Sequence, residues 1–224
     1  MHISRPSPIA SRVRSLAVAT IASALVVLTG CQVAYFLNLE EDKEVKAEYN
    51  KIGSRAVAVL VWADQSTLDE DPRVRQRICK AVTYYLKKNL PGANLVLPEE
   101  VTKLQERQGN VWEDLSTKQL CDRLKCDLIL RIDLLECTTR AGDARELRRG
   151  RVRATVNLYD SSPDAGREVV YQTEVLAKYP PESGRSVFDM DDADLLHETV
   201  EHFAELTARK FYDHKQSLRG PAEK

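Results

Sequence analysis

The chain has 224 residues, and its 33 basic and 34 acidic side chains nearly cancel to a formal net charge of −1. This balance excludes a protein that neutralises nucleic-acid phosphates over its whole surface. Charged residues make up 30% and aromatic residues 6%, which is typical of one globular domain and not of a low-complexity chain.

The first 30 residues have the parts of an export signal. Arg5, Arg12 and Arg14 give a positive start, residues 16–28 are apolar or small apart from two hydroxyls, and small residues precede a cysteine. The apolar run is shorter than the roughly 20 residues that a spanning helix needs. Residues 1–30 are therefore predicted to be a removed signal peptide, which leaves a net charge of −4 because only the three arginines are lost.

The motif Leu28-Thr29-Gly30-Cys31 resembles the lipobox of bacterial lipoproteins. The resemblance implies cleavage after Gly30 and acylation of the Cys31 thiol, so that acyl chains such as palmitate anchor the protein to the membrane. Several chains give stable anchoring, because each buried CH₂ contributes about 0.8 kcal/mol. Gln32 replaces the aspartate that resembles an inner-membrane retention signal, which favours the outer membrane, facing the periplasm. The alternative is an ordinary cleaved signal with a chance cysteine.

The mature chain is predicted to form one domain with a tether. Residues 31–55 read as a lipidated N-terminus and charged tether, residues 56–214 as a single globular α/β domain, and residues 215–224 as a polar tail. The domain opens with AVAVLVW (56–62), which is apolar at every position, as expected of a strand covered on both faces.

Helices and one short strand follow this first strand. Asp71 is predicted to cap a helix with Pro72 at its first position, and the apolar residues behind it recur at helical spacing until Pro91. NLVLP (94–98) predicts a short strand. Residues 99–108 and a segment that starts at Ser116 predict two short helices.

The apolar period changes to two in the second half of the domain. Residues 128–134 and 152–158 alternate, and residues 167–179 form a less regular third strand. Residues 189–215 predict an amphipathic helix, whose inner stripe consists of Leu195, Leu196, Thr199, Val200, Phe203, Leu206, Thr207 and Phe211. The order β-α-β-α-α-β-β-β-α predicts an α/β (α+β) domain with one mixed sheet and helices packed mainly on one face.

This order, behind a lipobox, resembles a family of bacterial envelope proteins. Three stretches carry the likeness: RAVAVLVWADQS (55–66), LSTKQLCDRLKCDLILRIDL (115–134), and the LYD…G.EVVY part of 151–175. The family includes the amino-terminal domain of TolB, the lipoprotein activators of penicillin-binding proteins and the curli-secretion channel lipoprotein. The likeness covers about residues 55–212, describes topology and not chemistry, and implies a non-enzymatic protein that binds other envelope proteins.

Two motifs rich in acids and histidines, HETVEH and DMDDAD, contain residue types that bind metals. In HETVEH the histidines His197 and His202 are five residues apart, which separates them by about 140° on a helix instead of the about 40° of H-E-x-x-H. DMDDAD (189–194) lacks the glycine and spacing of a calcium loop, and acids before a helix complement its dipole. We therefore predict no metal, no cofactor and no catalytic constellation.

Four cysteines remain after Cys31, and their pairing is open. They are Cys79, Cys121, Cys126 and Cys137. An even number in an exported protein suggests disulfides, with three connectivities possible, and buried free thiols are an equal alternative. Cys121 and Cys126 could not bond within one regular helix, but they could if the helix ends near Lys125.

RELRRGRVR contains a cluster of arginines: Arg145, Arg148, Arg149, Arg151 and Arg153. One interpretation is a solvated hairpin tip. The other is a patch that faces an anion or a partner in the envelope, such as a lipid head group or a cell-wall carboxylate.

The lipobox-like motif and the predicted fold leave three functions open. The first is a lipid-anchored adaptor or regulator that binds an envelope protein of unknown identity. The alternative is an oligomeric subunit of an outer-membrane secretion or assembly complex, of which a homo-oligomer is one form. An enzyme is the third, and it would need a pocket with converging polar groups.

Overall fold

The computed structural model describes residues 42–140, 148–162, 169–181 and 190–217. The chain divides into a small unit at its two ends and a larger unit, Lys46–His214. Two short strands, β1 (Asp42–Val45) and β7 (His214–Ser217), pair in a two-stranded sheet. Within these ranges, every helix is too short or too polar to cross a membrane.

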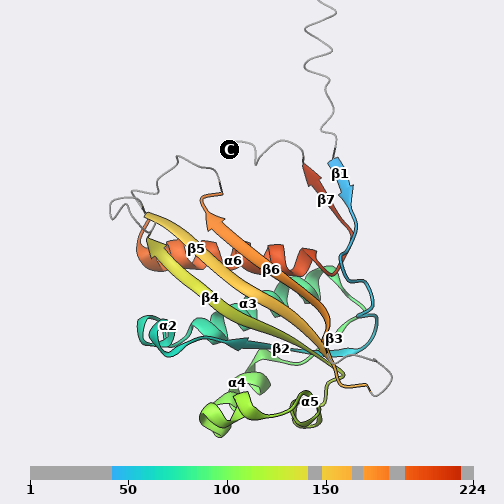
Figure 1. The fold of residues 1–224 in the computed structure, drawn as a ribbon. Helices are drawn as coiled ribbons and strands as arrows, with labels where there is room; N and C mark the ends of the chain where they lie inside the picture. The colour runs from blue at the N-terminus through green and yellow to red at the C-terminus, as the bar shows by residue number, and fades with distance from the viewer. Residues whose placement is uncertain (1–41, 141–147, 163–168, 182–189, 218–224) are drawn as a thin grey trace, which may run out of the picture. The chain divides into compact units, whose positions relative to one another are not determined.

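The larger unit is built on a mixed sheet with the strand order β3-β2-β4-β5-β6 (Figure 1). Its strands are β2 (Ala56–Trp62), β3 (Asn94–Leu95), β4 (Leu128–Arg140), β5 (Arg148–Asp160) and β6 (Val169–Tyr179). β2 runs parallel to both of its neighbours, and β4, β5 and β6 are antiparallel. The predicted mixed sheet is confirmed.

Helices cover one face of the sheet completely and the other in part. α3 (Val74–Asn89) and α6 (Asp192–Arg209) pack on one face, here called the inner face. α4 (Pro98–Gln108), the 3₁₀ helix η1 (Gly109–Asp114) and α5 (Thr117–Leu124) lie on the other side, over β2 and the start of β4 (Figure 1). The fold class predicted from the sequence is therefore confirmed.

The burial pattern follows this covering. All five central residues of β2, Val57–Val61, are buried, as a strand covered on both faces requires. In β4 the run Leu128–Leu130 is buried as well, and beyond it buried and partly exposed residues alternate. The strand changes its pattern where the cover of α5 ends.

The helix predicted to start at Asp71 begins later, at Val74. A short helix that the sequence did not reveal, α2 (Gln65–Glu70), precedes it and is capped by the Asp64 carboxylate, which accepts a hydrogen bond from the Thr67 backbone N–H (2.8 Å). Asp71 closes α2, and its carboxylate accepts from Arg73 N (3.1 Å). Asp71, which was predicted to cap the start of α3, therefore lies at the end of α2.

The compact unit begins at Lys46, ten residues before the predicted start of the domain. The Tyr49 backbone N–H donates to the Lys210 carbonyl oxygen (3.0 Å), and its ring lies 5.9 Å from that of Tyr171. Ile52 is buried. Tyr49 and Ile52 therefore pack the segment 46–55 against the domain. The many charges of this segment had predicted a tether.

Candidate functional site

The outer face of β4, β5 and β6 carries polar side chains and is the first candidate site. Strand register places its residues in four rows: Thr138, Arg151 and Lys178; Glu136, Arg153 and Leu176; Asp133, Thr155 and Glu174; Arg131, Asn157 and Gln172. We call these twelve residues the open face. The buried residues between them, such as Val152, Ala154 and Val156, point to the inner face under α6.

Charges on the open face are largely paired with one another. Arg153 lies 3.8 Å from both Glu136 and Glu174, and Arg151 lies 3.4 Å from Glu136. In the last row, the Asp133 carboxylate accepts from Arg131 Nε (2.7 Å) and from Asn157 Nδ2 (3.1 Å). With four basic and three acidic side chains, the twelve residues carry little excess charge.

Large apolar side chains reach solvent beside these ion pairs. Leu176 is 40% exposed in the same row as Glu136 and Arg153. Leu135 is 49% exposed at the irregularity of register between Leu134 and Glu136. An exposed leucine among paired charges is the mixture that protein interfaces use.

The structure does not gather the five predicted arginines on one surface. Arg151 and Arg153 belong to the open face, whereas Arg148 donates to the Met190 carbonyl oxygen (2.8 Å) and lies 3.8 Å from Asp192. Arg149 donates to the Pro181 carbonyl oxygen (3.4 Å). Arg145 lies outside the described residues. Arg148, beside the start of α6, and Arg151, beside Glu136, therefore meet different partners although they lie close together in sequence.

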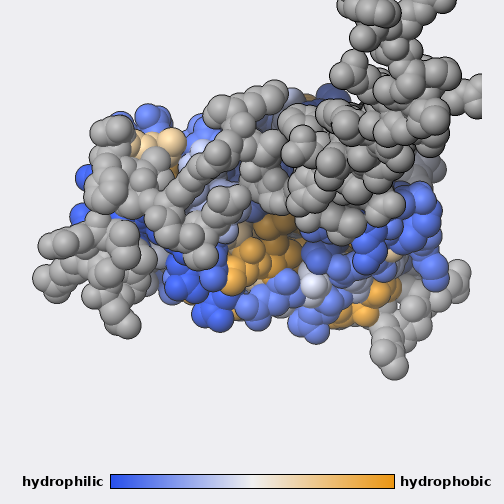
Figure 2. All heavy atoms as spheres, turned by 90° about the horizontal axis from the view of Figure 1, so that it is seen from above, coloured by the Kyte–Doolittle hydropathy of each residue, from blue (hydrophilic) through white to orange (hydrophobic). Residues whose placement is uncertain are grey.

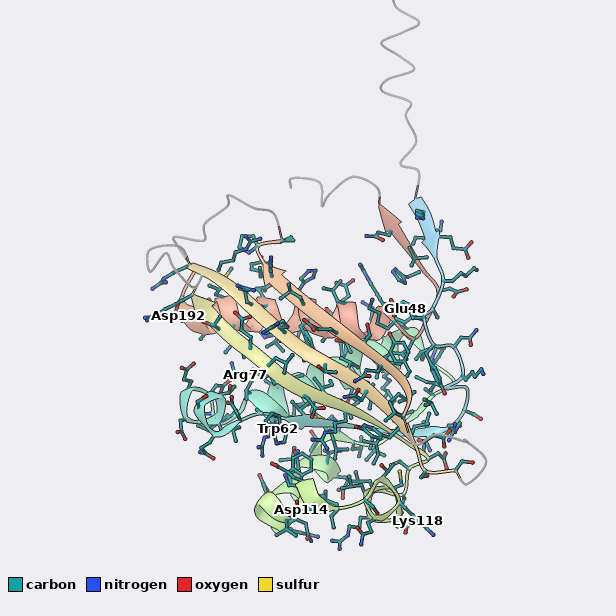
Figure 3. The ribbon with its side chains drawn as sticks, in the orientation of Figure 1. Glu48, Trp62, Arg77, Asp114, Lys118 and Asp192 are labelled. Atoms are coloured by element: carbon teal, nitrogen blue, oxygen red, sulfur yellow. The ribbon has the colours of Figure 1, made fainter. Side chains whose placement is uncertain are left out.

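A second candidate is a polar cleft of about 590 Å³ at the far end of β4. Its wall includes Arg77 of α3 and Asp192 of α6, which lie on the same side of the domain (Figure 3). Arg77 donates to Asp71 Oδ1 (2.7 Å). Burial raises the pKa of the Cys137 thiol in this wall to about 12, and no histidine is among the described lining residues. The neighbouring carboxylates of Asp71 and Glu70 also favour the protonated thiol, which is a weaker nucleophile than the thiolate.

A third candidate is a groove of about 470 Å³ between α4 and α5. Four bases line it with one acid: Lys103, Arg107, Arg123, Lys125 and Glu100. Lys103 Nζ donates to Glu100 Oε1 (2.8 Å), which leaves an excess of positive charge along the groove. The groove leaves no local signal in the sequence, because its bases come from two helices separated by η1.

The acid- and histidine-rich segment around α6 behaves as a helix start. Asp191 caps α6 by accepting from the Asp194 backbone N–H (2.7 Å), as predicted for acids before a helix. His202 is partly buried, and desolvation lowers its pKa. Among the described residues there is no group of three His, Cys, Asp or Glu side chains that could hold a metal ion.

Of the predicted cysteine sites, Cys31 and the motif residues Leu28, Thr29 and Gly30 lie outside the described residues. Cys79, Cys121 and Cys126 are buried, Cys137 is partly exposed, and all four are free thiols. Cys121 and Cys126 have their sulfur atoms 3.6 Å apart.

Figure 2 shows one face of the molecule, on which hydrophobic residues come to the surface between hydrophilic ones.

The sequence matches no protein-family model, and no curated protein matches it. Solved structures that show some similarity to this chain include a PelC dodecamer from Paraburkholderia phytofirmans, at 9% identity over 76% of this chain and 98% of that chain, with a TM-score of 0.43. Lipoprotein GNA1162 from Neisseria meningitidis is 14% identical over 69% and 98% of the two chains (TM-score 0.41). The hypothetical protein CT253 from Chlamydia trachomatis is 16% identical over 70% and 95% (TM-score 0.42). These values are too low for a function to be transferred.

Proposed function

We propose that this protein is a non-enzymatic, lipid-anchored adaptor of the bacterial envelope that binds a protein partner through its open face. The observation that carries the proposal is the exposure of Leu176 within the ion-paired row of Glu136 and Arg153. The lipobox-like motif that ends at Cys31 supports the anchor. The resemblance of residues 55–212 to the TolB-type envelope family supports the class of partner.

The chemistry of the open face suits a protein better than a small anion. Its guanidinium groups already have carboxylate neighbours on adjacent strands, so a simple anion would compete with Glu136 for Arg151 and Arg153. A protein surface with its own alternating charges can exchange these pairs one for one while it covers Leu176. Such an interface gains from apolar burial at its centre and uses the charges for orientation.

Site-specific photocrosslinking tests the docking surface. A photoreactive amino acid at Leu176 in the native, membrane-extracted protein is expected to give one discrete adduct. The same group at Tyr84 on α3, which is more exposed than Leu176 (59% against 40%), is expected to give none. Arg151→Glu with Arg153→Glu should remove the adduct at position 176. Equal labelling from both positions, or labelling that survives the charge reversal, would contradict the proposal.

The anchor is tested separately through Cys31. Replacing Cys31 with alanine should leave a full-length precursor or a soluble protein, because no thiol remains for acylation. A Cys31→Ala protein that is still processed, acylated and membrane-bound would remove this part of the proposal.

An oligomeric subunit of an outer-membrane assembly is the second candidate, and one observation favours it. β6 is the last strand of the sheet, and β5 is its only neighbour among the described strands. A free strand edge can pair with another chain. Light scattering of the native protein in mild detergent separates the two functions: a ring-sized mass favours the assembly subunit, and a monomer or dimer favours the adaptor.

A further inference from the structure

The chain reverses direction at the end of α5. The helix ends at Leu124, and Lys125 follows in the left-handed conformation with φ 52°. This turn lets the Cys126 backbone N–H donate to the Cys121 carbonyl oxygen (3.1 Å). A left-handed residue at this position commonly ends helices, although a lysine adopts it less readily than a glycine.

This turn brings two thiols together. The Cys126 Sγ–H donates to Cys121 Sγ across 3.6 Å, and both residues are buried, with exposures of 8% and 3%. In a regular helix, side chains five residues apart point in different directions. Because α5 ends at Leu124, Cys121 and Cys126 do not lie in one regular helix, and their spacing in sequence no longer prevents a bond.

The other two cysteines are held elsewhere. Cys79 lies on α3, on the inner face, where its Sγ–H donates to the Val59 carbonyl oxygen (3.2 Å). α5 lies on the opposite side of the sheet (Figure 1). Cys137 lies in the wall of the polar cleft near the end of β4. Among these four cysteines, Cys121 and Cys126 are the pair whose thiols are in contact.

The contact also makes the two thiols unequal. The hydrogen bond from Cys126 lowers the pKa of Cys121, and the same bond together with burial raises the pKa of Cys126. In this contact Cys121 is the thiol that loses its proton more readily, and the thiolate is the nucleophile in disulfide exchange.

We propose that Cys121 and Cys126 form a disulfide in the exported protein, which staples the end of α5 to the start of β4. The inference rests on the export step of the proposed function, because the compartment must supply a disulfide oxidant. The Cys121 thiolate attacks one sulfur of that oxidant, a protein or glutathione disulfide, and releases its other sulfur as a thiolate. Cys126 then loses its proton and attacks Cys121, expelling the second thiol. The pair loses two electrons and two protons, and the oxidant becomes a dithiol or two thiols.

Burial sets the time at which this reaction takes place. With Cys121 and Cys126 only 3% and 8% exposed, an oxidant reaches them before α5 docks on the sheet. Once the domain has closed, the same burial protects the bond from reductants. The staple would hold Arg123 and Lys125 at the basic groove, since these two residues lie between the cysteines.

The test is peptide mapping of the full chain recovered from membranes. Free thiols are blocked with N-ethylmaleimide in denaturant, and the protein is digested with trypsin without reductant. The expected product is QLCDR (119–123) linked to CDLILR (126–131), two hydrogens lighter than the sum of the free peptides. The Cys79→Ser/Cys137→Ser variant should give the same product. Cys121 and Cys126 both recovered as maleimide adducts would overturn the proposal.

A second arm separates the disulfide from the export on which it depends. If fractionation finds the protein in the cytoplasm, the proposed function fails, and the pair is tested by refolding the purified chain in a buffer of oxidised and reduced glutathione. The linked peptide should form there, and dithiothreitol should lower the Tm of the wild type but not that of Cys121→Ser. A refolded, soluble protein in which Cys121 and Cys126 are both free thiols would overturn the inference by itself.

Discussion

β2 and β6 belong to one sheet but meet different surroundings. The central residues of β2 are buried on both faces, between α3 and the α4–α5 layer. On β6, Val175 and Ala177 are buried under α6, whereas Glu174 and Leu176 are exposed on the open face. The helices α4 and α5 thus cover the β2 half of the outer face and leave the β6 half exposed to solvent. Stability should therefore depend on the β2 half and partner binding on the β6 half.

The largest effect is expected from the covered half. Leu60 is fully buried in β2, and Leu60→Ala should lower the free energy of unfolding by about 2–5 kcal/mol, because it removes apolar contacts and leaves a cavity. Urea unfolding measures this loss. A loss below about 1 kcal/mol would contradict the difference between β2 and β6, because it would mean that α4 and α5 do not enclose β2.

Gly150 tests how tightly α6 packs on the inner face. A methyl group on Gly150 would overlap Thr199 Oγ1 of α6, so Gly150→Ala should cost about 1–3 kcal/mol through overpacking. Adding Thr199→Ala should recover part of the loss. Gly92→Ala is the matched control, since a methyl group there meets nothing within 4 Å, and its Tm should stay near that of the wild type.

A paired carboxylate at the end of β5 makes stability depend on pH. Arg55 donates to both oxygens of the Asp160 carboxylate (2.6 and 2.5 Å) and thereby lowers the pKa of Asp160 below 3.8. The stabilisation is complete above 3.8 and is lost as the pH falls through the depressed folded pKa. Asp160→Asn should cost about 1–3 kcal/mol at pH 7 and lose less on acidification.

The exposed ion pair of Lys46 and Asp213 (2.9 Å) provides the control for this experiment. Asp213→Asn should lower the free energy of unfolding far less than Asp160→Asn in the same urea unfolding series, because solvent screens an exposed ion pair. An equal effect of the two substitutions would show that the burial of Asp160 contributes nothing.

The smallest effect on stability is expected on the open face. Leu176→Ser should change the free energy of unfolding by less than about 0.5 kcal/mol while it weakens capture of the partner. A destabilisation as large as that of Leu60→Ala would mean that the open face is covered by the protein itself and is not a docking surface.

The pattern of apolar residues was sufficient to predict most of the fold. AVAVLVW predicted a doubly covered strand, and the alternation in 128–134 and 152–158 predicted the antiparallel strands, because side-chain direction follows backbone period. α2 and the docking of residues 46–55 were missed, since short polar segments carry no period. Their structure depends on single contacts, such as the cap by Asp64 and the packing of Tyr49.

The candidate site was less predictable than the fold. A row of arginines in the sequence suggested one patch, but the strand distributes Arg148 and Arg151 to different environments. The basic groove was not visible, because Arg107 and Arg123 approach each other only after η1 turns the chain. Long-range neighbours are a property of the packed structure and leave no local signal.

The sequence by itself determined the lipobox-like motif, the order of the elements and the faces of the main strands, because each depends on residues close together in the chain. Only the tertiary structure decided which charges meet across β4, β5 and β6, where the α4–α5 layer stops, and that Cys126 turns back onto Cys121. These features depend on one left-handed residue, Lys125, and on the register of strands far apart in sequence, which are fixed only when the core packs.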